Sequence, residues 1–172
     1  FDDSKALQGP MLSLCEHEGI KGTILIAAEG INGTVAGPSQ GIVRLWEHIT
    51  ALPGCENLEH KESTAQSMPF KRMKVRLKKE IVTMGQPNVD PRAKTGHYVE
   101  ALDWNVLISS PDVAVIDTRN DYEVGIGTFE GAIDPQTKTF REFPAWWAKN
   151  KHRLQDKKIA MFCTGGIRCE KS

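Results

Sequence analysis

A stretch rich in proline and glycine divides this chain into two parts, each of which must fold around a core of its own. Residues 85–96 read GQPNVDPRAKTG, with no periodic apolar residues. Proline and glycine break helices and strands, so this composition is typical of a connecting loop. We therefore expect one domain over residues 1–84, a linker over 85–96 and a second domain over 97–172.

The first part predicts the order helix, hairpin, helix, strand. Apolar residues recur at helical spacing between Leu7 and Cys15, and two β runs joined by a tight turn follow in 22–37. Ser39 is placed to cap a second helix, and a further strand is expected near 70–77. This order is most of a split β-α-β-β-α-β arrangement, a ferredoxin-like sandwich in which only the first strand is missing.

The second part alternates helices with short apolar strands. Helix-like segments are expected over 100–109 and 140–150, and buried strands over 113–120 and 158–163. Such alternation is typical of a three-layer α/β domain. The chain is therefore expected to combine an α+β domain with an α/β domain.

Composition excludes some classes of protein. Basic and acidic residues number 22 each, so net charge indicates no polyanion partner, and any such site must come from a local patch. No run is long enough to cross a bilayer, so we expect no membrane partner. The four cysteines lack the spacing of a disulfide framework or a zinc site, which favours a reducing, cytoplasmic setting.

The clearest chemical signal is the loop after the last strand. Cys163 leaves the apolar run 159–162 and enters the sequence CTGGIR, which ends at Arg168. Glycines let successive backbone N–H groups converge on one point, and a helix beginning after the loop adds positive potential there. Both effects lower the pKa of a thiol from about 8.5 toward neutrality. The pattern alone leaves two interpretations, a reactive thiolate or a buried structural cysteine before a glycine turn.

A second motif accompanies the loop. The predicted strand ending in VIDTRN carries Asp117 and Arg119, with Glu123 and the sequence FEGAI after it. An aspartate-x-arginine strand end, then EGAI, then a cysteine entering a six-residue loop resembles the rhodanese domain. The resemblance implies that Asp117 and Arg119 support the loop and that Cys163 is a persulfide-forming nucleophile. The phosphatase relatives use a longer loop, so phosphatase activity is disfavoured.

The resemblance extends over nearly the whole chain. The segments KGTILIAAEGINGTVAG, VRLKKEIVTMG, VIDTRNDYEVGIGTFEGAI and MFCTGGIRCEKS together resemble the rhodanese-domain tRNA uridine hydroxylases, in which a ferredoxin-like domain precedes a rhodanese domain. The resemblance implies hydroxylation of the wobble uridine of tRNA at C5, giving 5-hydroxyuridine, with molecular oxygen as co-substrate. Family members continue past residue 172, so we expect a C-terminally incomplete rhodanese domain.

Cys163 is then the expected catalytic nucleophile. Addition of its thiolate to C6 of uracil would make C5 enolate-like and reactive toward oxygen, and a Cys163 persulfide is the competing species. Cys169 is either a resolving thiol or a packing residue.

No flavin, nicotinamide or metal motif is seen in the sequence, because it has no glycine fingerprint and no clustered histidines and carboxylates. The other expected active-site loop residues are Thr164, Gly165, Gly166, Ile167 and Arg168.

Two further functions stay open at this point. A sulfurtransferase would carry sulfane sulfur on Cys163. A non-enzymatic RNA-binding module would keep a vestigial rhodanese fold, although the intact Cys163 and Arg168 weigh against it.

A basic stripe is predicted on the last strand of the first part. The sequence FKRMKVRLKK alternates, so its cations are expected on one face, with Met73, Val75 and Leu77 on the other. Such a stripe is either a plain solvated face or a track for the phosphates of an anticodon stem-loop. We favour RNA contact because the family resemblance requires a tRNA surface. The four cations are Arg72, Lys74, Arg76 and Lys78.

Overall fold

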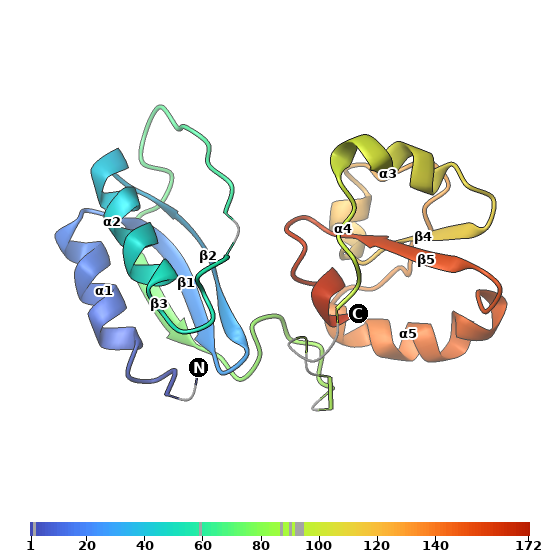
Figure 1. Cartoon of the computed structure of the whole chain (residues 1–172), viewed down its shortest axis with the longest axis horizontal. Coiled ribbons are helices and arrows are strands. Elements are labelled where there is room, and N and C mark those ends of the chain that lie inside the picture. Colours follow the sequence, from blue (N-terminus) through green and yellow to red (C-terminus); the bar gives the residue numbers. More distant parts are fainter. Residues whose placement is uncertain (2, 59, 87, 90, 92–94) are drawn as a thin grey trace. The chain divides into compact units, whose positions relative to one another are not determined.

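The computed structural model describes residues 1, 3–58, 60–86, 88–89, 91 and 95–172. Helices and strands are mixed, and the described chain forms two compact units, Phe1–Ile81 and Val82–Ser172 (Figure 1). Each unit has a hydrophobic core of its own. No helix of the described residues is long and apolar enough to span a membrane.

The first unit follows the predicted order of elements. Its helices and strands are α1 (Gln8–His17), β1 (Lys21–Ala27), β2 (Gly30–Ala36), α2 (Ser39–Thr50) and β3 (Met73–Leu77). The hairpin turn lies between β1 and β2, as expected.

The sheet of the first unit is mixed, with β1 in the centre. It pairs antiparallel with β2, from Lys21 opposite Ala36 to Ala27 opposite Gly30. It also pairs in parallel with β3, where Ile24 lies opposite Val75. This parallel pair departs from the ferredoxin-like expectation, because there the strand after the second helix runs antiparallel to the first strand of the hairpin. Element order in the sequence does not determine strand pairing.

Alternation along the strands separates a covered face from an open one. Both helices lie on the same face of the sheet (Figure 1). Ile24 and Val75 point into the core on that face, where they pack with Met11 of α1 and Leu45 of α2. Because neighbouring residues of a strand point to opposite faces, the basic residues of β3 lie on the open face.

The second unit is built on two parallel strands, β4 (Val113–Asp117) and β5 (Lys158–Phe162), in register from end to end. An isolated bridge adds Ile133 beside Ile116 of β4. The helices of this unit are α3 (Ala101–Ile108), α4 (Asp121–Val124) and α5 (Phe143–Asn150).

The second unit begins earlier than the sequence predicted. Met84 is buried in its core with Phe140 and Phe143, and Val82 packs against the same cluster. Sequence order alone places these two apolar residues with the first domain, since they follow its last strand, but they pack in the core of the second unit. Of the predicted linker, residues 87, 90 and 92–94 lie outside the described residues, and the described remainder contains no helix or strand.

Candidate active site at the carboxyl ends of two parallel strands

The parallel pairing of β4 and β5 brings the two sequence motifs together. Asp117, the last residue of β4, lies opposite Phe162, the last residue of β5. Arg119 follows β4 and Cys163 follows β5. Both residues therefore lie just beyond the same end of the sheet. Open α/β sheets place their binding sites at this carboxyl edge.

The loop residues surround the sulfur of Cys163 with hydrogen-bond donors. A hydrogen bond from the Cys169 side chain is the largest cause that lowers the pKa of the Cys163 thiol, to about 5, against the opposing effect of burial. Backbone N–H groups of Arg168, Cys169 and Gly165 add to the effect. The same contact raises the pKa of the Cys169 thiol. These contacts favour a Cys163 thiolate beside a protonated Cys169 at neutral pH.

The curvature of the loop backbone turns its N–H groups toward the Cys163 sulfur. Gly166 has a φ of 84°, in the left-handed region that favours glycine. A Cβ at this residue would lie 3.1 Å from the hydroxyl oxygen of Tyr98, whose ring covers the loop. After Arg168 the described chain forms a 3₁₀ turn, Cys169–Lys171. The N–H groups that converge on the Cys163 sulfur thus polarise it.

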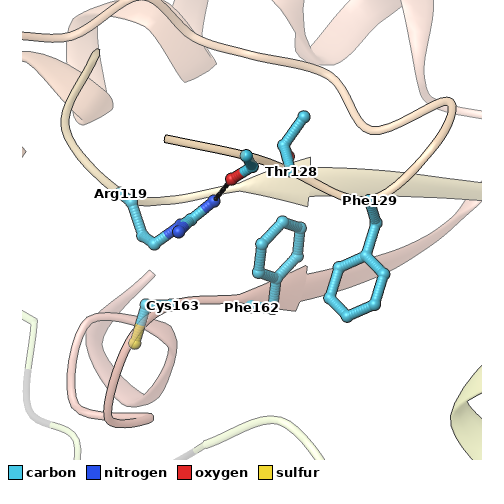
Figure 2. Close-up of a pocket in the computed structure, with 6 residues that line it drawn as sticks. Arg119, Thr128, Phe129, Phe162 and Cys163 are labelled. Atoms are coloured by element: carbon cyan, nitrogen blue, oxygen red, sulfur yellow. Dashed lines mark hydrogen bonds between the residues drawn. The ribbon is translucent and has the colours of Figure 1, made fainter. Parts of the chain in front are cut away.

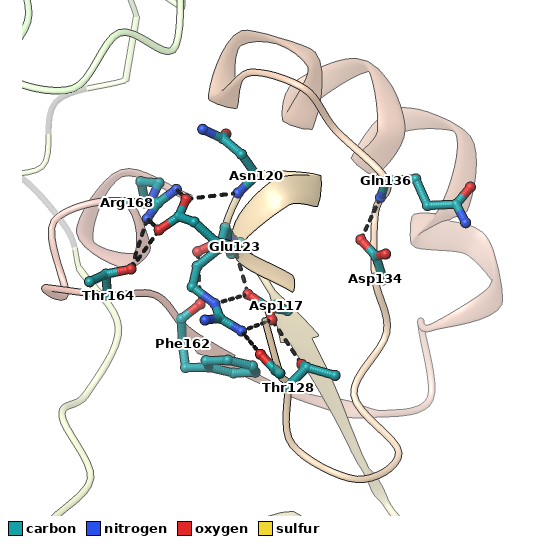
Figure 3. A network of polar contacts seen from close by, with 12 residues as sticks. Asp117, Asn120, Glu123, Thr128, Asp134, Gln136, Phe162, Thr164 and Arg168 are labelled. Carbon is teal, nitrogen blue, oxygen red and sulfur yellow. Dashed lines mark hydrogen bonds and ion pairs between the residues drawn. The ribbon is translucent and has the colours of Figure 1, made fainter. Parts of the chain in front are cut away.

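Arg168 is paired with a carboxylate, and it also interacts with the Cys163 sulfur through its charge and a side-chain hydrogen bond. Its Nη1 lies 2.6 Å from Oε2 of Glu123 and its Nη2 lies 2.8 Å from Oε1 (Figure 3). Thr164 donates to the same carboxylate at 2.6 Å. The Arg168 hydrogen bonds are the main cause that lowers the pKa of Glu123 to about 2. Glu123 therefore ties both ends of the loop to α4.

Glu123 is the residue whose role the sequence interpretation missed. It stands in the motif after Asp117 and Arg119, but no function was assigned to it. Its carboxylate also accepts a hydrogen bond from the backbone N–H of Asn120 at 3.1 Å. An Asn followed three residues later by Glu is the pattern of a helix-capping box, and that signal was available in the sequence.

Asp117 and Arg119 form a second buried network beside the first. Asp117 is fully buried, and it accepts hydrogen bonds from Arg119 Nε at 2.9 Å, Arg119 Nη2 at 2.7 Å and Thr128 Oγ1 at 2.8 Å (Figure 3). Burial raises the pKa of this carboxyl, but the hydrogen bonds from Arg119 and Thr128 outweigh it and hold the pKa below its ordinary value. Arg119 Nη2 also donates to the Gly127 carbonyl at 2.6 Å. The pair thus joins the end of β4 to the 127–128 segment.

A pocket of about 430 Å³ opens beside Cys163 (Figure 2). This volume lies within the range of small-molecule sites, roughly 300–1,000 Å³. The rings of Phe129 and Phe162 form its apolar wall, with their centroids 4.8 Å apart in an edge-to-face arrangement. The lining residues are Arg119, Gly127, Thr128, Phe129, Phe162 and Cys163.

The predicted basic residues belong to the first unit. Arg72, Arg76 and Lys78 are exposed and Lys74 is half-buried. The apolar face expected on this strand is observed at Val75 but not at Leu77, which is 37% exposed because it ends the strand. The predicted residues thus form two groups, the loop with its two networks in the second unit and the basic stripe in the first.

The pKa of Cys163 makes a direct prediction about its reactivity. Alkylation by iodoacetamide, followed by peptide mass spectrometry between pH 4 and 9, should rise with a midpoint near pH 5 for Cys163. Cys15 should react only at high pH, because burial raises the pKa of its thiol to about 11. A Cys163 midpoint above pH 8 would contradict the thiolate site.

Among the residues that the structure describes, no group of three or more His, Cys, Asp or Glu side chains is arranged to hold a metal ion.

Comparisons with known proteins cover both units. The model of the family described as "UPF0176 acylphosphatase like domain" matches residues 1–81, which coincide with the first unit. A tRNA uridine(34) hydroxylase of Roseobacter denitrificans is 64% identical over all 172 residues, which cover 58% of that relative. One of Ruegeria pomeroyi is 66% identical over 172 residues, covering 57% of its length.

The chain spans somewhat more than half the length of these relatives. A third relative of the same name, from Gluconobacter oxydans, is 64% identical over 176 residues and again matches the whole chain. The matched residues extend through both units. The whole chain is therefore similar to part of the proteins named tRNA uridine(34) hydroxylase.

Proposed function

We propose that the protein acts in the cytoplasm as a tRNA wobble-uridine hydroxylase, and that Cys163 is its catalytic nucleophile. The observation that carries this proposal is the position of the Cys163 sulfur, which lies among N–H groups of its loop and beside a pocket with an aromatic wall. The relatives' name states the substrate position, uridine 34 of tRNA. We also propose that the second unit is a rhodanese-like domain, on the basis of its parallel β4–β5 pair and its six-residue loop from Cys163 to Arg168.

The reaction begins with the thiolate in this proposal. The Cys163 sulfur adds to C6 of the uracil ring, and the electrons of the C5–C6 double bond move toward the C4 carbonyl oxygen. C5 becomes electron-rich and accepts one atom of molecular oxygen. The other oxygen atom leaves as water, after taking two electrons from an external reductant and two protons from the solvent. Elimination of Cys163 and loss of the C5 proton restore the aromatic ring and give 5-hydroxyuridine.

The substrate geometry suits an anticodon loop. Wobble-position bases are unpaired and can be turned out of the stack at low cost. A planar base can then pack against the rings of Phe129 and Phe162. We propose the anticodon stem-loop of tRNA as the partner of this pocket.

Mass spectrometry of tRNA nucleosides tests the function. Deletion of the gene should remove 5-hydroxyuridine and its derivatives while thiolated nucleosides persist, and the full-length protein should restore them. Retention of all 5-hydroxyuridine derivatives in the deletion strain would overturn the proposal.

A sulfurtransferase is the second candidate. The N–H groups of Gly165, Arg168 and Cys169 that surround the Cys163 sulfur would stabilise a persulfide anion equally well. The same deletion strain separates the two functions, since a sulfurtransferase predicts that thiolated nucleosides fall and 5-hydroxyuridine remains.

We further propose that the open face of the first unit's sheet contacts the phosphates of the tRNA. Lys74 and Arg76 lie in register with Thr23 and Leu25 of β1, so they extend the face opposite to α1 and α2 among the described residues of this unit. Arg72 and Lys78 lengthen the same stripe beyond the two ends of the strand.

Reversing the charge of this stripe should weaken tRNA binding without unfolding the protein. In the triple variant R72E/K74E/R76E, each lost phosphate contact should reduce the salt slope of binding by about 0.7 to 0.9. The loss should be similar for all tRNAs, because phosphate contacts do not read sequence. Filter binding over a salt series measures the slope, and R141E/R153E, at two exposed arginines of the second unit, is a matched control. Unchanged binding by the triple variant would leave the stripe a plain solvated face.

A further inference from the structure

We propose that Arg119 reads the C4 carbonyl of the substrate base and so selects uracil over cytosine. This inference rests on the proposed function, because it assigns the pocket beside Cys163 to the target base. The family resemblance implied only a supporting role for Arg119. The geometry of its guanidinium leaves one group for a ligand.

The guanidinium of Arg119 is held in a single orientation. Its Nε and Nη2 bond the two oxygens of buried Asp117 at 2.9 and 2.7 Å, and Nη2 also bonds the Gly127 carbonyl at 2.6 Å. Its carbon Cζ lies 5.4 Å from the centroid of the Phe162 ring. Three contacts and an aromatic face thus fix a planar cation that lines the pocket (Figure 2).

The third nitrogen of this cation remains for a ligand. In a planar guanidinium whose Nε–Nη2 edge faces a carboxylate, Nη1 points away from that carboxylate. Nη1 makes no hydrogen bond to any residue that the structure describes. Arg119 keeps its charge in all conditions of interest, so Nη1 can only donate. The pocket therefore presents a fixed donor, beside an aromatic wall, to whatever it binds.

A fixed donor distinguishes the two pyrimidines at C4. Uracil presents a carbonyl oxygen there, which accepts a hydrogen bond, whereas cytosine presents an amino group, which donates one. Cytosine would set donor against donor and leave both groups without a partner. A site built around such a bond rejects the wrong ligand far more strongly than an apolar pocket does.

The same contact would assist the first chemical step. When the Cys163 lone pair forms the S–C6 bond, the π electrons of C5=C6 shift and the C4 oxygen becomes an enolate. No proton, oxidant or reductant enters this step. A donor fixed at the C4 oxygen strengthens as that negative charge develops, as in an oxyanion hole.

Substrate analogues test the contact with the unaltered full-length protein. Anticodon stem-loops carrying uridine, 2-pyrimidinone ribonucleoside or cytidine at the wobble position are compared by anaerobic fluorescence anisotropy. Loss of the C4 oxygen in 2-pyrimidinone should weaken binding roughly 10- to 100-fold, the usual effect of one hydrogen bond to a charged group. Cytidine should bind more weakly still. Equal binding of uridine and 2-pyrimidinone would overturn the proposal.

A protein variant then assigns the effect to Arg119. In R119K the uridine to 2-pyrimidinone ratio should fall close to one, whereas R141K, at an exposed arginine of the same unit, should keep the wild-type ratio. A purely structural role for Arg119 would weaken both stem-loops equally and keep the ratio, which would contradict the assignment. Hydroxylation of the uridine stem-loop in air by the wild type tests the proposed function separately.

Discussion

The variant C163S should form no 5-hydroxyuridine, while its melting temperature stays within a few degrees of the wild type. A serine hydroxyl is not ionised at neutral pH, so the hydrogen bonds that hold the Cys163 thiolate cannot make it a comparable nucleophile. The side chain is half-buried at the end of a strand, and serine differs from it by one atom. Nucleoside mass spectrometry of tRNA after incubation with the purified full-length protein measures the product.

Two variants of the neighbouring cysteine serve as controls. C169S keeps a hydroxyl donor toward the Cys163 sulfur and should retain substantial activity. C169A removes the donor that contributes most to the lowered pKa of Cys163. In this variant the pH midpoint for alkylation of Cys163 should therefore move up from about 5. Complete loss of activity in C169S as well would show that the two cysteines act together as a redox pair, and that Cys163 is not a sufficient nucleophile.

The second large effect is expected at the residue that ties the loop down. E123Q should lower the free energy of unfolding by about 3 kcal/mol, because it leaves the Arg168 guanidinium without its charged partner in a mostly buried place. The side chains of Arg168 and Glu123 are only 13% and 15% exposed. Urea denaturation, followed by circular dichroism, measures the loss.

The pH dependence of this effect has a definite sign. The pKa of Glu123 is lowered to about 2 by its hydrogen bonds from Arg168, so its contribution is full above the ordinary carboxyl pKa and disappears as the pH falls toward 2. The difference in stability between wild type and E123Q should therefore shrink on acidification. A constant difference from pH 7 to pH 3 would contradict the ion-pair explanation.

An exposed ion pair of the same unit is the matched control. Lys158 lies 3.7 Å from Asp112, with the two side chains 77% and 54% exposed. Since such surface pairs contribute between zero and about 1 kcal/mol, K158Q should change stability little. R168K keeps a positive charge but cannot form both hydrogen bonds to Glu123, so it should fall between the wild type and E123Q in stability.

Periodicity and turn residues in the sequence predicted the local elements of this protein. Alternation marked β3, and short β runs bounded by turn residues marked β1, β2, β4 and β5, because both signals depend only on residues close together in the chain. The cysteine loop followed from composition as well, since only glycine adopts the φ of Gly166 without strain. The resemblance to the tRNA uridine hydroxylases likewise rests on short segments of sequence.

Tertiary structure decided which of these pieces meet. The parallel pairing of β1 with β3, and the burial of Met84 in the second unit, depend on contacts between residues distant in the chain. Glu123 acquired its role in the same way, because its partner Arg168 follows 45 residues later. A sequence gives the position of each charged residue along the chain, but not the distance between two charged side chains in the fold. Hydrogen bonds act only over about 3 Å, so the networks around Cys163 became visible only when β4 and β5 were placed side by side.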